Sequence, residues 1–381
     1  MKKVMTAGAS LLLTTSIASA GGIERAVPST GLLFEDGNYL ELNFSYAKPD
    51  VSGTQAIGPI FASSVGSASG NMSEDYVQLG FGYKNDLNDQ MAIAVIFDQP
   101  YGADVNYASD TDYAYGGGIS PLGTTATVDS NAVTVLLSYK LRENVTVYGG
   151  GRAVQTMGEV AYFNGYTMET STETDFGYVL GAAWERPEIA ARVSLTYQSA
   201  VEHDFDATEA GPDVPGFLAD TSFSTTMPQA LTLEGQTGVA ADTLLFGSVR
   251  WVNWTEFDIT PTYAPGGSSL VDYTDDRVTY SLGLGRRFSD EWSGAVTAGY
   301  EGSVGGLATN LGPVDGNTSL GVAVTRTMDQ VRITGGVRYI WLGDAETEAP
   351  TAFTGGASGV TFANFEDNSA LAAGVRIAYN F

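Results

Sequence analysis

The sequence predicts an all-β protein: a transmembrane antiparallel β-barrel of about 14 strands that follows an export signal. The final segment, residues 370–381, alternates apolar odd positions with small or polar even positions and ends on Phe381. A strand with lipid on one face and a polar lumen on the other needs this period of two. Residues 1–20 combine Lys2 and Lys3 with a short apolar run and small residues before Gly21, which indicates a signal peptide. These features predict an integral protein of the outer membrane of a Gram-negative bacterium.

Amphipathic segments recur along the chain from residue 38 onward, joined alternately by short and long connections. An even number of strands lets antiparallel hairpins close into a barrel with both ends on one side. We expect the short connections to be periplasmic turns and the long ones (48–73, 99–128, 158–174, 198–226, 253–275, 302–317, 343–366) to be extracellular loops. The predicted strands are 39–47, 75–83, 91–97, 132–141, 145–156, 176–185, 189–197, 229–237, 243–252, 278–287, 292–300, 319–326, 331–341 and 370–381.

Composition excludes several classes of protein. No segment after residue 20 has the roughly 18 uninterrupted apolar residues of a transmembrane helix. The chain has no cysteine, which excludes disulfides and thiolate metal sites, and nothing in it points to a cofactor. A net charge of −26 argues against nucleic acid as a partner. Acidic runs at 204–220 and 272–276 form either a solvated loop surface or a site where divalent cations bridge to outer-leaflet sugars.

Five segments resemble the FadL family of outer-membrane transporters for long-chain fatty acids and other hydrophobic compounds. They are residues 97–103, 184–197, 227–233, 242–251 and 312–317, found in this order on the strand pattern. The resemblance implies a fourteen-stranded barrel, which agrees with the independent strand count. It also implies passive transport by loop capture, binding in the lumen and release through the side of the barrel. Precedent in the family is monomeric, with outer-membrane lipid and lipopolysaccharide as surroundings.

One departure from the family concerns the N-terminal hatch that plugs the barrel. Residues 21–37 are too short for a full hatch, and they lack the Asn-Pro-Ala motif that family members usually carry. We expect this segment to enter the lumen as a reduced plug or as a ligand-contacting tail, with Ile23 and Arg25 as its candidate contacts. The barrel proper would then span 38–381.

Two long loops carry apolar residues suited to a hydrophobic ligand. An acyl chain gains about 0.8 kcal/mol for each CH₂ that it buries, so an apolar cleft is a source of affinity. In the family the corresponding loops form a capture groove; alternatively, these side chains only pack the loops together. The candidates are Val160, Tyr162, Phe163, Tyr166, Met168, Phe205, Val214, Phe217, Leu218 and Phe223.

Strand parity points several arginines into the lumen. A guanidinium can hold a carboxylate headgroup through two parallel hydrogen bonds. Lumen arginines also pair with lumen carboxylates to fill and stiffen a barrel, and both roles stay open. The headgroup candidates are Arg152, Arg192, Arg250, Arg338 and Arg376.

Enzymatic chemistry is not expected. His203, the single histidine, has no evident Ser partner at a strand rim, and we expect it to be exposed in a loop. One histidine and no cysteine leave only oxygen ligands for a metal, so no metal site is predicted. The family's side opening belongs to strand three, yet Ala92, Ala94 and Ile96 provide no glycine or proline to mark it there.

Two further functions compete with hydrophobic transport. The short N-terminal segment allows a water-filled diffusion porin for small polar solutes, because an unplugged barrel of this size could conduct ions and sugars. A purely structural or adhesive barrel is the third hypothesis, although it leaves the apolar loop residues unexplained.

Overall fold

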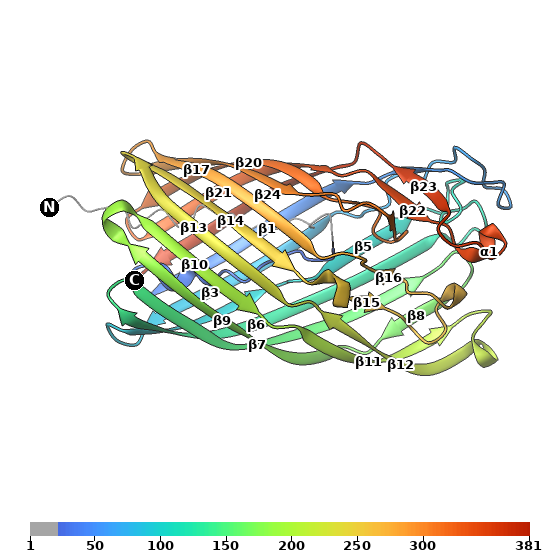
Figure 1. Cartoon of the computed structure of the whole chain (residues 1–381), viewed down its shortest axis with the longest axis horizontal. Helices are drawn as coiled ribbons and strands as arrows, with labels where there is room; N and C mark the ends of the chain where they lie inside the picture. The colour runs from blue at the N-terminus through green and yellow to red at the C-terminus, as the bar shows by residue number, and fades with distance from the viewer. Residues whose placement is uncertain (1–21) are drawn as a thin grey trace.

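The computed structural model describes residues 22–381, so the signal peptide predicted at 1–20 lies outside the described residues. The described chain forms a closed antiparallel barrel of 14 strands, as predicted (Figure 1). The barrel strands, in chain order, are β1 (Tyr39–Asp50), β3 (Tyr76–Asp86), β4 (Met91–Asp98), β6 (Thr124–Arg142), β7 (Val145–Ala161), β9 (Glu173–Arg186), β10 (Ala191–Gln198), β13 (Ala230–Ala240), β14 (Thr243–Val252), β17 (Arg277–Arg287), β18 (Trp292–Glu301), β20 (Asn317–Met328), β21 (Val331–Leu342) and β24 (Ser369–Asn380).

The first and last strands close the sheet. β1 pairs with β24 along its whole length, from Tyr39 opposite Asn380 to Asp50 opposite Ser369. Closure leaves the sheet without an edge, which hydrocarbon requires because it offers no hydrogen-bond partners to a free backbone. No helix among the described residues is long and apolar enough to span a membrane.

The two faces of the wall differ as the alternation predicts. On β1, Leu42 and Phe44 are about half exposed on the outer face, whereas Glu41 is buried in the lumen. The same alternation appears on β24, where Leu371 and Val375 face outward and Arg376 is buried. The outer face therefore presents an apolar band to lipid, and the lumen collects the polar side chains.

The long connections contain more regular structure than the sequence pattern predicts. β6 and β7 extend well beyond the predicted ends of their segments, and β11 and β12 form a hairpin that continues the wall outward from β10 and β13. These additions lie in the half of the molecule opposite the C-terminus, where α1 also lies (Figure 1). They are β2 (Gly53–Gln55), β5 (Gly102–Tyr107), β8 (Thr167–Thr170), β11 (Val201–Ala210), β12 (Leu218–Met227), β15 (Asp258–Ile259), β16 (Val271–Asp272), β19 (Leu307–Ala308), β22 (Ala345–Glu348), β23 (Thr361–Phe365), α1 (Thr351–Thr354), and 3₁₀ turns at Pro215–Phe217, Trp254–Glu256 and Pro265–Gly267. Two other 3₁₀ turns lie elsewhere: Thr30–Phe34 precedes β1, and Pro187–Ile189 forms the short connection between β9 and β10.

The N-terminal segment, residues 22–37, lies inside the barrel and is held by ion pairs to the wall. Glu24 receives two hydrogen bonds from Arg250, at 2.5 and 3.0 Å, and both side chains are buried. Nearer the end of the barrel where β1 begins, Glu35 pairs with Arg332 at 2.6 Å. We call residues 22–37 the lumen tail; its charges are matched by wall residues at both ends.

Replacing Arg250 with Ala is expected to release the outer end of the lumen tail. Breaking a buried pair on one side leaves an uncompensated charge, at a cost of about 3–5 kcal/mol. We therefore expect larger ion currents from Arg250→Ala than from the unmodified protein in planar bilayers. The control is Arg287→Ala, because the Arg287–Asp242 pair is largely exposed. Equal currents from all three proteins would show that this ion pair does not hold the tail.

Candidate functional site

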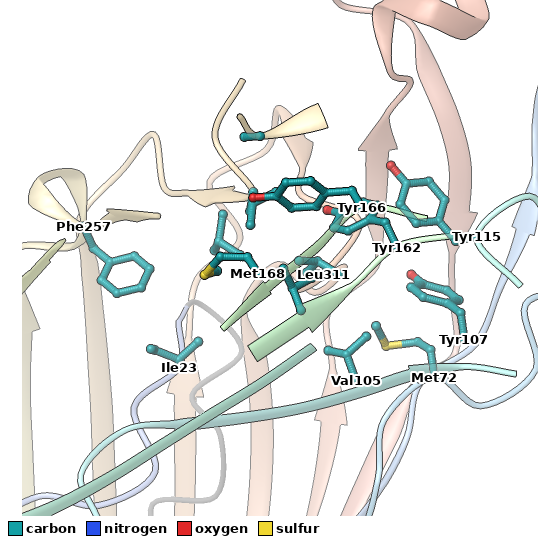
Figure 2. Packing of buried hydrophobic residues seen from close by; sticks show 14 of the residues in the cluster. Ile23, Met72, Val105, Tyr107, Tyr115, Tyr162, Tyr166, Met168, Phe257 and Leu311 are labelled. Carbon is teal, nitrogen blue, oxygen red and sulfur yellow. The ribbon is translucent and has the colours of Figure 1, made fainter. Parts of the chain in front are cut away.

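An apolar cavity of about 180 Å³ lies between the outer end of the lumen tail and the extracellular loops. For comparison, an engineered apolar cavity of about 150 Å³ in another protein stays dry and binds benzene. The apolar walls of the present cavity come from segments far apart in the sequence. They include Ile23, Val51, Met72, Val105, Val128, Val160, Met168, Phe205, Phe223, Met227, Ile259, Leu270, Tyr273, Leu311 and Val314. Figure 2 shows Ile23, Met72, Val105, Met168 and Leu311 within the same buried cluster.

Few charges border this cavity, and they are mostly acidic. Arg25 donates a hydrogen bond to Asp104 at 2.8 Å and lies 3.9 Å above the centre of the Tyr76 ring. Glu74 and Glu159 also line the cavity. Because Arg25 is neutralised by Asp104, the two remaining carboxylates make the border net negative. Such a border disfavours an anionic ligand.

The predicted loop residues divide into three groups. Val160, Met168, Phe205 and Phe223 line the cavity. Phe217 and Leu218, at 66% and 63% exposed, are surface residues at the tip of the β11–β12 hairpin and do not line the cavity, so their role in a capture groove stays a prediction. The remaining four are buried in the loop cluster behind the cavity, which agrees with the alternative of loop packing: Tyr162, Phe163, Tyr166 and Val214.

A cluster of aromatic rings packs the loops beside the cavity. Tyr115 is its centre, with ring centroids 5.0 Å from Phe163 and 5.4 Å from Phe362. Tyr107 adds a stacked contact to Tyr113 at 5.4 Å. These rings come from three different connections, so they fix the loops that form the outer wall of the cavity.

A single buried carboxylate ties three loops together. Glu209 on β11 is 0% exposed and accepts four hydrogen bonds. The donors are the hydroxyls of Tyr166 and Thr221 and the backbone N–H groups of Thr262 and Tyr263, at 2.6–3.0 Å. With every lone pair engaged in this way, Glu209 holds the β7–β8 connection, the β11–β12 hairpin and the β14–β17 connection in one arrangement.

The arginines predicted to meet a headgroup lie below the cavity. Arg152 is bound to Asp98 through two hydrogen bonds, at 2.6 and 3.1 Å, and Arg250 is bound to Glu24. For both, a buried carboxylate occupies the guanidinium, which agrees with the alternative that lumen arginines pair with lumen carboxylates; their headgroup role stays a prediction. Arg192 stacks on Phe34, with its guanidinium 4.4 Å from the ring centre, and borders a smaller polar cavity of about 80 Å³.

The other two arginines also face the lumen side of the wall. Arg376 borders the same polar cavity and lies 3.9 Å from Glu41. Arg338 is half-buried on β21. Neither lines the apolar cavity.

His203 is fully buried rather than exposed, so the sequence-based expectation was wrong. Its Nδ1 lies 2.8 Å from an oxygen of Asp175, and its Nε2 lies 3.3 Å from the hydroxyl of Thr156. The misassignment came from treating 198–226 as an irregular loop; as part of β11, His203 takes an inward position like Phe205 and Glu209. Among the described residues no cluster of three His, Asp or Glu side chains is arranged to hold a metal ion.

The wall is interrupted between β3 and β4, next to the cavity. After the Phe81–Phe97 pair, β4 turns inward at Gln99 and Pro100, and the chain continues as β5. Gln99 provides hydrogen-bond partners for β3 where β4 no longer pairs with it. Its side-chain oxygen accepts a hydrogen bond from the N–H of Leu79 at 2.9 Å, and its backbone carbonyl accepts one from the side-chain amide of Gln78 at 3.3 Å.

The lumen tail pairs with the chain that turned inward. Pro100 accepts hydrogen bonds from the N–H groups of Arg25 and Ala26, and the N–H of Gly102 donates to Ile23. A small cavity of about 60 Å³ lies in the wall at this point. Tail residues Ala26, Val27 and Ser29 line it together with the outer-face residues Phe44, Leu79 and Phe97. We call it the wall passage.

The sequence left the position of a side opening undetermined, and it identified five of the fifteen apolar cavity residues named above: Ile23, Val160, Met168, Phe205 and Phe223. Residues 91–97 carry no glycine or proline to mark an opening, whereas Pro100 lies just beyond them, in a segment assigned to a loop. Pro100 and Gly102 were the available signal, because a proline inside a strand pattern argues against continued pairing. For Val105 and Leu311 nothing in the sequence signals that they line a cavity, because their neighbours there come from loops distant in the chain.

The structure thus defines an outer-membrane barrel with an apolar cavity above a lumen filled with ion pairs. A family model described as outer membrane protein transport protein (OMPP1/FadL/TodX) matches residues 28–381. The chain therefore belongs to this family of transport proteins for hydrophobic compounds, and it is not an enzyme. It is an integral protein of the Gram-negative outer membrane.

Solved structures with the same fold are remote in sequence. A FadL homologue from Pseudomonas aeruginosa is 14% identical, with a TM-score of 0.76 over 97% of this chain and 98% of that chain. The toluene transporter TodX from Pseudomonas putida is 13% identical, with a TM-score of 0.65 over 97% and 98%. The toluene transporter TbuX from Ralstonia pickettii is 13% identical, with a TM-score of 0.61 over the same shares. No curated protein matches the chain in sequence.

Replacing Glu209 with Gln is expected to loosen the loops without unfolding the barrel. The amide puts an N–H₂ group among four donors, and each buried donor left unpaired costs about 1–3 kcal/mol. Limited proteolysis should cut the extracellular loops faster in Glu209→Gln, while the heat-modifiable migration of the barrel on gels stays unchanged. The control is Glu169→Gln, a change at an exposed position on β8. Equal cleavage rates in both variants would refute the anchoring role.

Proposed function

We propose that the apolar cavity is the binding site for the transported molecule, and that this molecule is a small uncharged hydrophobic compound. The observation that carries the proposal is a cavity with predominantly apolar walls inside a barrel of a transport family. Burial of apolar surface contributes about 25 cal/mol per Å², which supplies affinity without specific polar contacts. Passive movement follows, since binding and release need no energy source.

Size and charge favour a compact neutral ligand over a fatty-acid anion. The cavity's volume of about 180 Å³ suits one aromatic ring or a short alkyl group. The carboxylates of Glu74 and Glu159 repel an anionic headgroup, and the arginine at the cavity, Arg25, is already paired. Long-chain fatty acids remain the second candidate, supported by membership in the family.

We further propose that the ligand leaves sideways through the wall passage into the outer leaflet. The passage is lined by tail residues in the lumen and by Phe44 and Leu79 of the lipid-facing side. It lies close in the chain to Gly102, which lines the apolar cavity. The lumen tail acts as a reduced plug, because its ion pairs to Arg250 and Arg332 fill the lumen below. This filling gives no support to a water-filled porin.

Polar substitution inside the cavity is expected to reduce transport. Val160→Asn places an amide among apolar side chains, and burying it without partners costs about 1–3 kcal/mol, or roughly tenfold in affinity. Uptake of labelled toluene by bacteria that carry this chain should fall accordingly. Leu218→Asn serves as the control, since Leu218 is exposed outside the cavity. Labelled oleate is measured in parallel: uptake of oleate but not toluene would overturn the neutral-ligand proposal.

Filling the wall passage is expected to block release while leaving binding intact. A Cβ at Gly80 would lie 3.3 Å from the side chain of Asn43, and Gly80 lines the passage. Gly80→Met should therefore retain toluene binding in detergent and lose most uptake in cells. Gly335→Met is the matched control, because a Cβ at Gly335 meets open space elsewhere in the wall. Normal uptake by Gly80→Met would refute sideways release at this site.

A further inference from the structure

Two buried threonines from different strands line the apolar cavity, and a buried histidine neighbours both. Thr156 on β7 and Thr225 on β12 both line the cavity, and they are only 3% and 2% exposed. His203 on β11 lies opposite Thr225 in the hairpin register and contacts Thr156. The proposed route of the ligand gives none of the three a role. Among the described residues, Thr156 is the cavity residue whose hydroxyl is hydrogen-bonded to a buried histidine.

The protonation of His203 sets the direction of its two hydrogen bonds. Asp175 can only accept, so the Nδ1 of His203, 2.8 Å away, carries the proton. Burial lowers the pKa of His203, although Asp175 acts in the opposite direction, and the ring is therefore neutral at neutral pH. In this tautomer Nε2 is an acceptor, and the hydroxyl of Thr156 donates to it at 3.3 Å.

The hydroxyl proton of Thr225 is also directed away from the cavity. It is donated to the backbone carbonyl of Asp258 at 2.9 Å. Both threonine oxygens thus keep lone pairs but have no proton to offer. A ligand hydroxyl that reaches them finds acceptors, whereas a carboxylate oxygen finds no donor. Glu74 and Glu159, the carboxylates at the border of the cavity, also repel an anion.

We propose that Thr156 and Thr225 form a hydrogen-bond acceptor site for the hydroxyl group of a neutral hydrophobic ligand, an alcohol or a phenol. The proposal rests on the proposed function of the cavity and adds to it the chemical class of a preferred ligand. His203 and Asp175 act as positioning residues, because they fix the orientation of the Thr156 hydroxyl without touching the ligand.

The test compares p-cresol with toluene, which differ by one hydroxyl group. Both are titrated calorimetrically into the full purified barrel in detergent. The Thr156→Val, Thr225→Val double variant removes both acceptors at nearly constant volume. We expect it to bind p-cresol about tenfold more weakly and toluene as before, since a ligand hydroxyl without its partner loses about that factor.

Thr208→Val is the control. Thr208 lies on β11 with an exposed side chain and does not line the cavity, so its loss should leave the binding of both ligands unaffected. An unchanged p-cresol affinity in the double variant, or an equal loss for both ligands, would overturn the acceptor site. Absence of toluene binding to the unmodified protein would overturn the proposed function of the cavity and the acceptor site with it.

Discussion

Complete pairing of the backbone inside the membrane is the constraint on which the rest of this structure depends. Hydrocarbon cannot satisfy an N–H or C=O group, so a β-sheet crosses it only when closed. The β1–β24 seam supplies that closure. At the place beside the cavity where β3 loses its neighbour, the Gln99 side chain accepts the Leu79 N–H in place of a strand. The Leu79 N–H is therefore paired although β4 no longer pairs with β3 at that position.

The lumen tail and the wall interruption are physically coupled. After β4 the chain turns away from β3 at Pro100. The turned segment forms its backbone hydrogen bonds with the tail instead, through Arg25, Ala26 and Ile23. The same stretch of tail is anchored by the Glu24–Arg250 pair and the Arg25–Asp104 pair. Any displacement of the tail therefore removes partners from the inward turn. A plug much shorter than the hatch usual in the family can still control the wall, because it is bonded directly to the interrupted strand.

The sequence was sufficient for the barrel and for part of the site. Alternation is a local property of each strand, so the strand count and the lumen direction of Arg152 and Arg376 follow from parity alone. Residue type also identified Val160 and Phe205 as candidate ligand contacts in a loop capture groove, and both line the cavity. Parity could not show that Asp98 binds Arg152, because the two lie 54 positions apart. The burial of His203 escaped for a related reason: an extended hairpin outside the membrane follows the same alternation, and the segment was treated as irregular.

The distribution of charged and apolar side chains along the lumen affects the direction in which a neutral ligand would leave the cavity. Below it lie Arg152 and Arg250 with their buried carboxylates, and an apolar molecule that enters there would disrupt charge pairs that hydration cannot compensate. Beside it lies the wall passage, with Phe44, Leu79 and Phe97 on its outer side. A molecule that moves this way exchanges one apolar contact for another and keeps the roughly 25 cal/mol per Å² gained by leaving water. On the proposed sideways route, a neutral ligand would displace the Gln99 contacts rather than the ion pairs. Two hydrogen bonds between neutral groups are weaker than a buried bidentate ion pair, so this route would have the lower barrier.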